Sequence, residues 1–154
     1  MEVETFAELE PEFTERIQKM VWCSMATVDG QGRPRSRVIH PLWEGLTGWI
    51  TTRRHSFKGQ HLARNPYISL AYVADPIKPV YVDCLAAWAD DPADKQRVWD
   101  LCLQTTPPLG FDPAPIYKSV DDPGFGVLRL TPWRIQLADG MPPFTPKVWR
   151  AKEG

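Results

Sequence analysis

The sequence has few cysteines and no long apolar run. Cys23, Cys84 and Cys102 are widely spaced and odd in number, so we expect three buried thiols rather than a disulfide framework or a CxxC metal clip. The apolar stretches are far shorter than the roughly 18 to 20 residues that cross a bilayer, which excludes a membrane-spanning helix. Six glutamates precede the first arginine, the reverse of a secretory signal, and this predicts a cytoplasmic protein.

Several catalytic motifs are also missing. His40, His55 and His61 lack the i, i+3 or i+4 spacing that brings two ligands together on a helix, so no metal site is predicted. There is no GxSxG nucleophile elbow, which excludes the common hydrolase arrangement. The glycines of residues 30–32 are followed by Arg33, Pro34 and a β-rich segment instead of a helix, so they predict a hairpin turn and not a dinucleotide site.

Proline and tryptophan are abundant. The 154 residues include 7 Trp and 16 Pro, and this proline content is about twice the usual share of roughly 5%. A long helix could not avoid so many prolines, so a helical bundle is excluded. With 43% hydrophobic and 24% charged residues, the chain has the composition of one globular domain spanning 1–154.

Hydrophobic periodicity predicts strands joined by hairpins, with short helices between them. Expected strands cover 21–29, 36–43, 48–52, 67–74, 80–89 and 124–139. Expected helices cover about 11–20, a segment capped by Ser56 and stopped by Asn65-Pro66, and 90–105, while 107–115 is a Pro-rich loop and 140–154 a Pro-rich tail. This order indicates a small, mainly β antiparallel barrel with flanking helices, in which proline occupies turns and strand ends.

The net charge of −1 hides a strong asymmetry. Residues 33–64 hold seven basic side chains against the single acid Glu44, a local formal charge of +6, so the remainder sums to −7. Nucleic acid could bind such a segment, but the acidic remainder and the absence of a recognised motif argue against that partner.

Part of this basic segment has the chemistry of a phosphate site. Arg35 and Arg37 share a strand face, and an arginine fork can hold a phosphate through two hydrogen bonds. The side chains expected to complete the cradle are the hydroxyls of Thr51, Thr52 and Ser56 and the ammonium of Lys58 at a helix start. From the local chemistry alone, a solvated basic face explains these residues equally well.

Four segments, RSRVIHPLW, ITTRRHSFKGQHLARNPYISLAYV, PVYVDCLAAWA and LRLTPWRIQL, together resemble the pyridoxamine 5′-phosphate oxidase-like family of flavin and deazaflavin oxidoreductases. The similarity covers roughly residues 15 to 139. Its most specific part is the pattern T-T-x-x-x-S-x-K-x-x-x-L-x-x-N-P from Thr51 to Pro66.

The resemblance implies a six-stranded antiparallel split β-barrel of Greek-key type and a homodimer that binds FMN, or the related deazaflavin coenzyme, at the subunit interface. It implies that Arg37, Ser56 and Lys58 hold the cofactor phosphate, that Thr51 and Thr52 line its ribityl side, and that the strand around Asp83 runs near the isoalloxazine of one of the two sites. The full expected cofactor-binding set is Arg35, Arg37, Val38, Ile39, Thr51, Thr52, Ser56, Phe57, Lys58, Asp83 and Trp133.

The sequence departs from true pyridoxamine phosphate oxidases at three points. It has Pro41-Leu42 where they carry a second basic residue, Phe57 where they carry an arginine, and no Arg-rich segment at its end. We therefore expect a substrate other than a vitamin B6 phosphate.

Function then rests on the cofactor, which would pass a hydride to or from a small organic substrate. His40 is the candidate for donating a proton near the ring, against a packing role, and Trp88 and Trp133 are the candidates for stacking on a planar ligand. Deazaflavin is the first alternative, because its polyglutamate tail would use the further positive charges Arg33, Arg35, Arg53, Arg54 and Arg64. A non-catalytic module that holds flavin or haem is the second.

Overall fold

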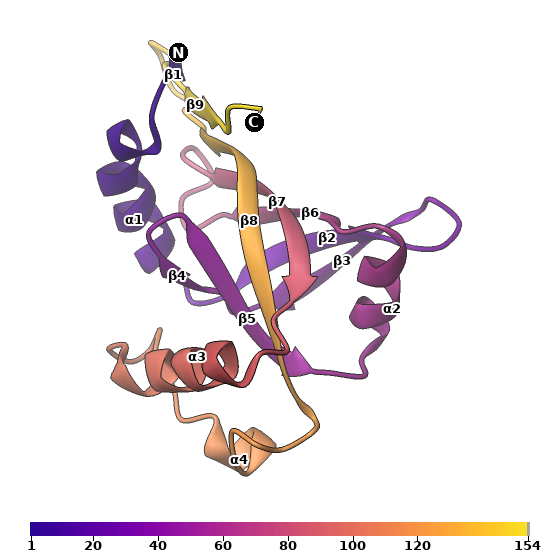
Figure 1. Cartoon of the computed structure of the whole chain (residues 1–154). Coiled ribbons are helices and arrows are strands. Elements are labelled where there is room, and N and C mark those ends of the chain that lie inside the picture. The colour runs from indigo at the N-terminus through magenta and orange to yellow at the C-terminus, as the bar shows by residue number, and fades with distance from the viewer. Residues whose placement is uncertain (154) are drawn as a thin grey trace.

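A computed structural model describes residues 1–153, except for the side chains of Phe57 and Lys58. Within these residues the strands are β1 (Glu2–Val3), β2 (Cys23–Val28), β3 (Pro34–Ile39), β4 (Leu42–Glu44), β5 (Thr47–Arg53), β6 (Tyr67–Tyr72), β7 (Val80–Trp88), β8 (Phe125–Leu137) and β9 (Lys147–Arg150). The helices are η1 (Phe6–Glu8, a 3-10 turn), α1 (Glu10–Gln18), α2 (Phe57–Arg64), α3 (Pro92–Gln104) and α4 (Ala114–Tyr117), arranged around the sheet as Figure 1 shows.

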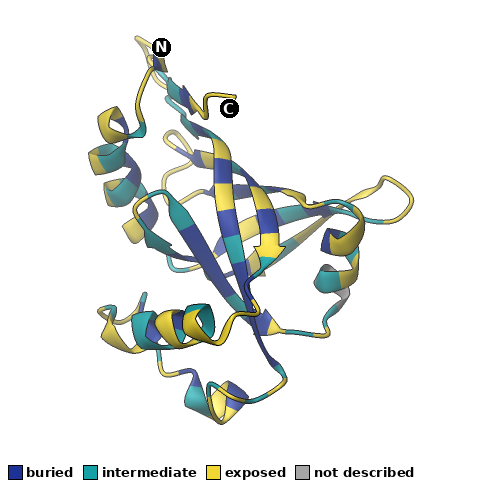
Figure 2. Cartoon of the chain, in the orientation of Figure 1, coloured by how far each residue is buried: buried dark blue, intermediate teal, exposed yellow. Residues whose placement is uncertain are grey.

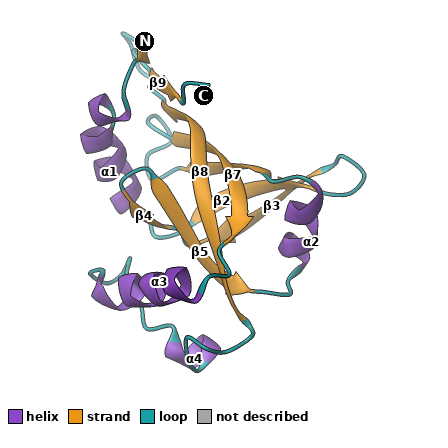
Figure 3. Cartoon of the chain, in the orientation of Figure 1, coloured by secondary structure: helices purple, strands orange, loops and turns teal. Residues whose placement is uncertain are grey.

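The mainly β class with flanking helices is confirmed (Figure 3). The expected six strands become nine within the described residues, because β1 and β9 are short additional strands and the segment expected as one strand at 36–43 forms both β3 and β4. The expected Pro-rich tail contains β9, which pairs antiparallel with β8 and parallel with β1.

The strands form one sheet in the order β1-β9-β8-β7-β6-β2-β3, and β5 joins it by pairing with β8 and with β4. The long strand β8 pairs with β7 along most of its length, with β5 through its first half and with β9 through its last residues. Among the described residues no ladder joins β3 to β4 or β5, so the sheet is open at that point. Closure into a six-stranded barrel stays a prediction.

Burial follows the pleat of the strands (Figure 2). In β7, Val80, Val82, Cys84 and Ala86 are buried, while the residues between them are exposed or half-buried. Period-two burial of this kind places one face of the sheet on the core. All three cysteines are buried, as predicted.

Helices cover the remaining parts of the core. Phe13 and Ile17 of α1 are buried, and the Phe13 ring packs edge-on against Trp43 with ring centroids 5.4 Å apart. The Asp91 side chain caps α3 by accepting a hydrogen bond from the Ala93 N–H at 2.8 Å, as Asp commonly does at this position. Val98 of α3 belongs to a second apolar cluster.

The segment predicted as one strand, 36–43, is divided by His40 and Pro41. Pro41 has no backbone N–H to donate to a ladder, so β3 ends at Ile39 and β4 begins at Leu42. This break places His40 at the end of β3, beside the open part of the sheet.

Candidate functional site

A cavity of about 500 Å³ lies where the sheet is open, between β3 and β5. The described residues that line it are Val21, Trp22, Val38, Ile39, His40, Ile50, Thr51, Pro108, Phe111, Ile116 and Tyr117. Val38, Ile39 and Thr51 were expected to bind a cofactor, so this cavity is the candidate functional site.

One end of the cavity is aromatic, and the other, here called the polar end, adjoins polar residues that lie just beyond the lining residues. Five antiparallel pairings connect β3 to β5, so the two strands run in opposite directions. Arg37 precedes the lining residues of β3 and Thr52 follows those of β5, which puts both at the same end. His40 is three residues beyond Arg37, roughly 10 Å along an extended chain.

Arg37 is held against helix α2. Its Nη2 donates to the buried hydroxyl of Thr27 at 2.9 Å and lies 3.4 Å from Nδ1 of His61, a residue of α2. Burial, and then the charge of Arg35, lower the pKa of Arg37, although a guanidinium stays protonated in proteins. In the described part of the chain neither arginine forms an ion pair with a carboxylate, so this pair of cations lacks a counterion.

Ser56 occupies the cap position of α2 with an extended backbone, yet its side chain makes no cap hydrogen bond. Its hydroxyl oxygen is buried without a partner among the described residues. The Ser56 N–H donates to the Arg53 carbonyl at 3.2 Å, so the turn keeps the start of α2 at the Thr52 end of β5. The predicted roles of Phe57 and Lys58 fall on side chains outside the described residues.

Two arginines of the basic segment are already paired. Arg33 contacts Asp29 at 2.9 Å, and Arg54 contacts Asp90 at 2.9 Å. Arg54 also lies over the Trp88 ring, 4.3 Å from its centroid, so Trp88 is covered and the structure does not support its predicted stacking on a ligand. Arg35, Arg53 and Arg64 make no ion pair with a carboxylate within residues 1–153, and all three are exposed.

Asp83 and Trp133 do not line the cavity between β3 and β5. Asp83 accepts a hydrogen bond from Ser69 at 2.7 Å and pairs with Arg134 at 3.2 Å on the outer face of the sheet. Trp133 lines a separate hollow with Tyr67, Leu85 and residues 150–153. One chain therefore does not bring these two residues to the cavity between β3 and β5.

The aromatic end of the cavity includes residues that sequence reasoning missed. Trp22 and Phe111 flank His40, with ring centroids 5.4 Å and 5.2 Å from the imidazole. The expected strand at 21–29 starts only at Cys23, which leaves Trp22 outside it and 55% exposed. Phe111 belongs to the segment that we expected to be only a Pro-rich loop, and nothing in its spacing indicated a wall.

His40 and Tyr117 are the polar groups at the aromatic end, and they differ in their hydrogen bonding. Burial lowers the pKa of His40, and a hydrogen bond to the Leu109 backbone partly offsets the effect, while Nε2 has no partner among the described residues. Burial raises the pKa of Tyr117, and its hydrogen bond with Thr51 partly offsets that change. Tyr117 thus has a polar neighbour in Thr51, whereas Nε2 of His40 has no hydrogen-bond partner among the described residues.

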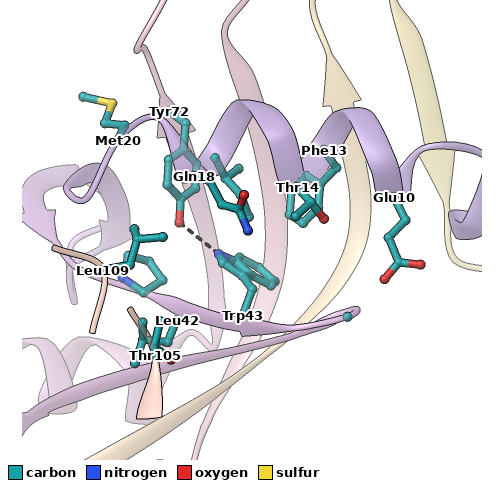
Figure 4. A pocket seen from close by; sticks show the side chains of 13 residues that line it. Glu10, Phe13, Thr14, Gln18, Met20, Leu42, Trp43, Tyr72, Thr105 and Leu109 are labelled. Atoms are coloured by element: carbon teal, nitrogen blue, oxygen red, sulfur yellow. Dashed lines mark hydrogen bonds between the residues drawn. The ribbon is translucent and has the colours of Figure 1, made fainter. Parts of the chain in front are cut away.

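A second cavity, of about 290 Å³, lies between α1 and β4 (Figure 4). Phe13, Trp43 and Tyr72 form part of its wall, and the Trp43 indole donates to the Tyr72 hydroxyl at 2.9 Å. None of the expected cofactor-binding residues lines it.

No group of three or more His, Cys, Asp or Glu side chains among residues 1–153 could hold a metal ion. No helix in this part of the chain is long and apolar enough to cross a membrane.

The fold and the cavity define a mainly β domain with a ligand-sized opening between β3 and β5, two strands that do not pair with each other. The profile described as pyridoxamine 5′-phosphate oxidase matches residues 9–139, and the chain belongs to this family. Among curated proteins, general stress protein 26 of Bacillus subtilis (strain 168) is 27% identical over 118 residues, covering 74% of this chain and 76% of that protein.

Solved structures share the fold. A NimC/NimA family protein from Clostridium acetobutylicum has a TM-score of 0.75 at 15% identity and covers 95% of this chain and 94% of its own. A pyridoxamine 5′-phosphate oxidase-related, FMN-binding protein from Nostoc punctiforme PCC 73102 has a TM-score of 0.61 at 14% identity, with coverage of 94% and 97%. Structures of an F420 reductase and of HutZ, the haem storage protein of Vibrio cholerae, are also similar, with TM-scores of 0.58 and 0.61.

Proposed function

We propose that the protein binds FMN between β3 and β5 and acts as an oxidoreductase on a small organic substrate. The observation that carries the proposal is the polar end of the cavity, where Arg35 and Arg37 lack a counterion and the buried Ser56 hydroxyl lacks a partner. A phosphate monoester supplies both the counterion and the hydrogen-bond partner, because it carries nearly two negative charges and several acceptor oxygens. FMN binding by the similar Nostoc protein supports the same choice.

Different residues would bind the phosphate of FMN and enclose its ring system. Arg37, fixed by Thr27, would hold the phosphate through its guanidinium, and Ser56 would donate its hydroxyl while α2 offers its first N–H groups. The apolar side chains of Val38, Ile39 and Ile50 would exclude water from a flat ring system. When bound, FMN supplies the hydride-transfer chemistry, and the protein positions and shields it.

The proposed functional unit is a homodimer. Asp83 and Trp133 lie away from the cavity of their own chain, so they can serve a cofactor only in the site of a second copy. An exposed apolar group, Tyr67, Leu85 and Trp133, adjoins Asp83 on the outer face of the sheet and would be covered in such a pair.

Titration of the purified protein with FMN tests the proposal. We expect saturable binding at micromolar concentration and a flavin absorption spectrum after removal of free ligand. Failure of FMN to bind, with the chain shown to be folded by circular dichroism, would overturn the assignment. Reduction of the bound flavin by a nicotinamide donor, followed by its reoxidation by an organic acceptor, distinguishes an oxidoreductase from a module that only holds flavin or haem.

Deazaflavin is the second candidate, and one observation favours it. Arg35, Arg53 and Arg64 are exposed and have no carboxylate partner within the described residues, so they could receive a polyglutamate tail. Arg33 and Arg54 are not available for such a tail, because they are paired with Asp29 and Asp90. Parallel titrations decide between the two, since saturation by the deazaflavin alone contradicts FMN.

A further inference from the structure

The aromatic end of the cavity has the features of a substrate chamber. Its walls are Trp22, His40 and Phe111, with Ile116 and Tyr117 close by. None of the described residues that line the whole cavity is Asp, Glu, Lys or Arg. A charged ligand would lose its hydration here without gaining a counterion, so the chamber disfavours ions.

The shape of the walls favours a flat ligand. Trp22 is 55% exposed and Ile116 is 52% exposed although both line the cavity, so an apolar ligand would cover surface that now faces water. Aromatic side chains pack well against planar rings, in offset-stacked or edge-on arrangements.

The imidazole of His40 has one buried nitrogen, Nε2, without a hydrogen-bond partner among the described residues. Burial lowers the pKa of His40 and so favours the neutral imidazole, while a hydrogen bond with the Leu109 backbone raises the pKa, as a carbonyl acceptor of a ring N–H does. A neutral imidazole has a single N–H, so its other nitrogen, the unpartnered Nε2, is an acceptor. The expected proton donor is thus arranged to accept a hydrogen bond.

We infer that this chamber binds an uncharged, flat, apolar molecule bearing one O–H or N–H group, which donates to Nε2 of His40. His40 is then the residue that determines which class of substrate the proposed flavin enzyme accepts. Calling this ligand the substrate rests on the proposed function.

Three matched probes test the inference on the unmodified protein, by calorimetric titration with and without saturating FMN. The probes are 2-naphthol, which has a donor, 2-methoxynaphthalene, which has only an acceptor, and 2-naphthoate, which is an anion. We expect 2-naphthol to bind about fivefold more tightly than 2-methoxynaphthalene, the usual net contribution of one hydrogen bond, and 2-naphthoate to bind most weakly. Equal affinities for the two neutral probes, or tighter binding of the anion, would overturn the inference.

Two variants locate the effect. His40→Phe keeps an aromatic ring between Trp22 and Phe111, so it should retain 2-methoxynaphthalene binding and remove the preference for 2-naphthol. Trp22→Ala should weaken both neutral probes together and leave their ratio unchanged. A preference for 2-naphthol that persists in His40→Phe contradicts the assignment to Nε2.

The same titrations separate this inference from the proposed function. FMN binding without a preference for 2-naphthol would defeat the chamber alone. A His40-dependent preference for 2-naphthol in a protein that does not bind FMN would defeat the flavin proposal and leave the ligand class standing.

Discussion

The guanidinium of Arg37 donates to the hydroxyl of Thr27, 2.9 Å away, from the neighbouring strand. Thr27 is only 1% exposed, so this contact fixes the arginine head from the core side. A charge held in this way needs little reordering when an anion arrives, and preorganised groups bind with a smaller loss of conformational entropy.

Replacement of Arg37 tests the phosphate end of the cavity. We expect Arg37→Ala to weaken FMN binding by roughly 1.5 to 3 kcal/mol, as for the loss of charge-assisted hydrogen bonds, without unfolding the sheet. Arg33→Ala is the matched control, because Arg33 is exposed and paired with Asp29. Fluorescence titration of FMN measures both, and equal losses in the two variants would point to a general charge effect.

Ser56 offers a test that separates binding from stability. A serine at a helix cap normally stabilises the helix by about 1 kcal/mol through its side chain, but Ser56 makes no such bond. Ser56→Ala should therefore leave the apo protein's melting temperature unchanged and weaken FMN binding by about 1 kcal/mol. A fall in the apo melting temperature with unchanged affinity would assign the hydroxyl to the fold.

Subunit complementation tests the shared site. Arg37→Ala and Trp133→Ala should each impair FMN binding, because each removes one side of every site in the dimer. Mixed by unfolding and refolding together, the two variants form heterodimers with one intact site, so about one quarter of all sites should recover in a 1:1 mixture. Absence of recovery, in a mixture shown to be dimeric by sedimentation, would place both residues in one chain's site.

Gly126 of β8 pairs with Thr52 of β5, near the polar end of the cavity. A Cβ at this residue would lie 2.7 Å from the Thr52 carbonyl oxygen and 2.7 Å from the Trp88 ring. Gly126→Ala should therefore destabilise the protein by roughly 1 to 3 kcal/mol, as overpacking does. Gly124→Ala is the control, since its Cβ would come no nearer than 3.3 Å to the Asp122 carboxylate, and thermal unfolding compares the two.

Glu12 joins α1 to the C-terminal strand. Hydrogen bonds from Lys147 and Arg16, at 2.9 Å and 2.6 Å, lower the pKa of Glu12 from 4.5, with burial opposing them. A lowered pKa in the folded state means that this stabilisation is complete above the unfolded value and is lost as the pH falls through the folded one.

Glu12→Gln should therefore lower the free energy of unfolding by roughly 0.5 kcal/mol at pH 7, a value reduced by partial exposure of the pair. The difference from the unmodified protein should shrink as the pH falls below 4.5. Glu15→Gln, whose carboxylate meets the exposed Lys19 at 3.3 Å, serves as the control in denaturant titrations. A difference that is constant with pH would contradict an ionic origin.

Sequence patterns predicted most of the longer elements of this fold because their signals are local. Hydrophobic periodicity marked β7, and Pro92 with its Asp cap marked α3. The division of β3 from β4 at Pro41 was readable from proline chemistry but was missed, since the β-rich residues continue through it. Strand β9 was not foreseen, because part of its pairing is with β1, at the other end of the chain.

Sequence patterns grouped the residues of the polar end but not the aromatic walls. A phosphate cradle has a compact sequence pattern, whereas the aromatic walls come from residues 22 and 111, which share no motif and meet only at His40. The pairing of Arg54 with Asp90 was hidden because the two residues are 36 positions apart, whereas the pairing of Arg33 with Asp29 is local and was missed.

Four separate stretches of chain, near residues 21, 39, 50 and 112, supply the walls of the cavity between β3 and β5. A ligand that needs all of them can bind only after the sheet has assembled and the loop between α3 and α4 has docked onto it. Retention of the ligand then reports on the completeness of folding. Loosening of that loop alone would release it while the strands remain paired, so ligand loss and unfolding of the sheet should separate during heating.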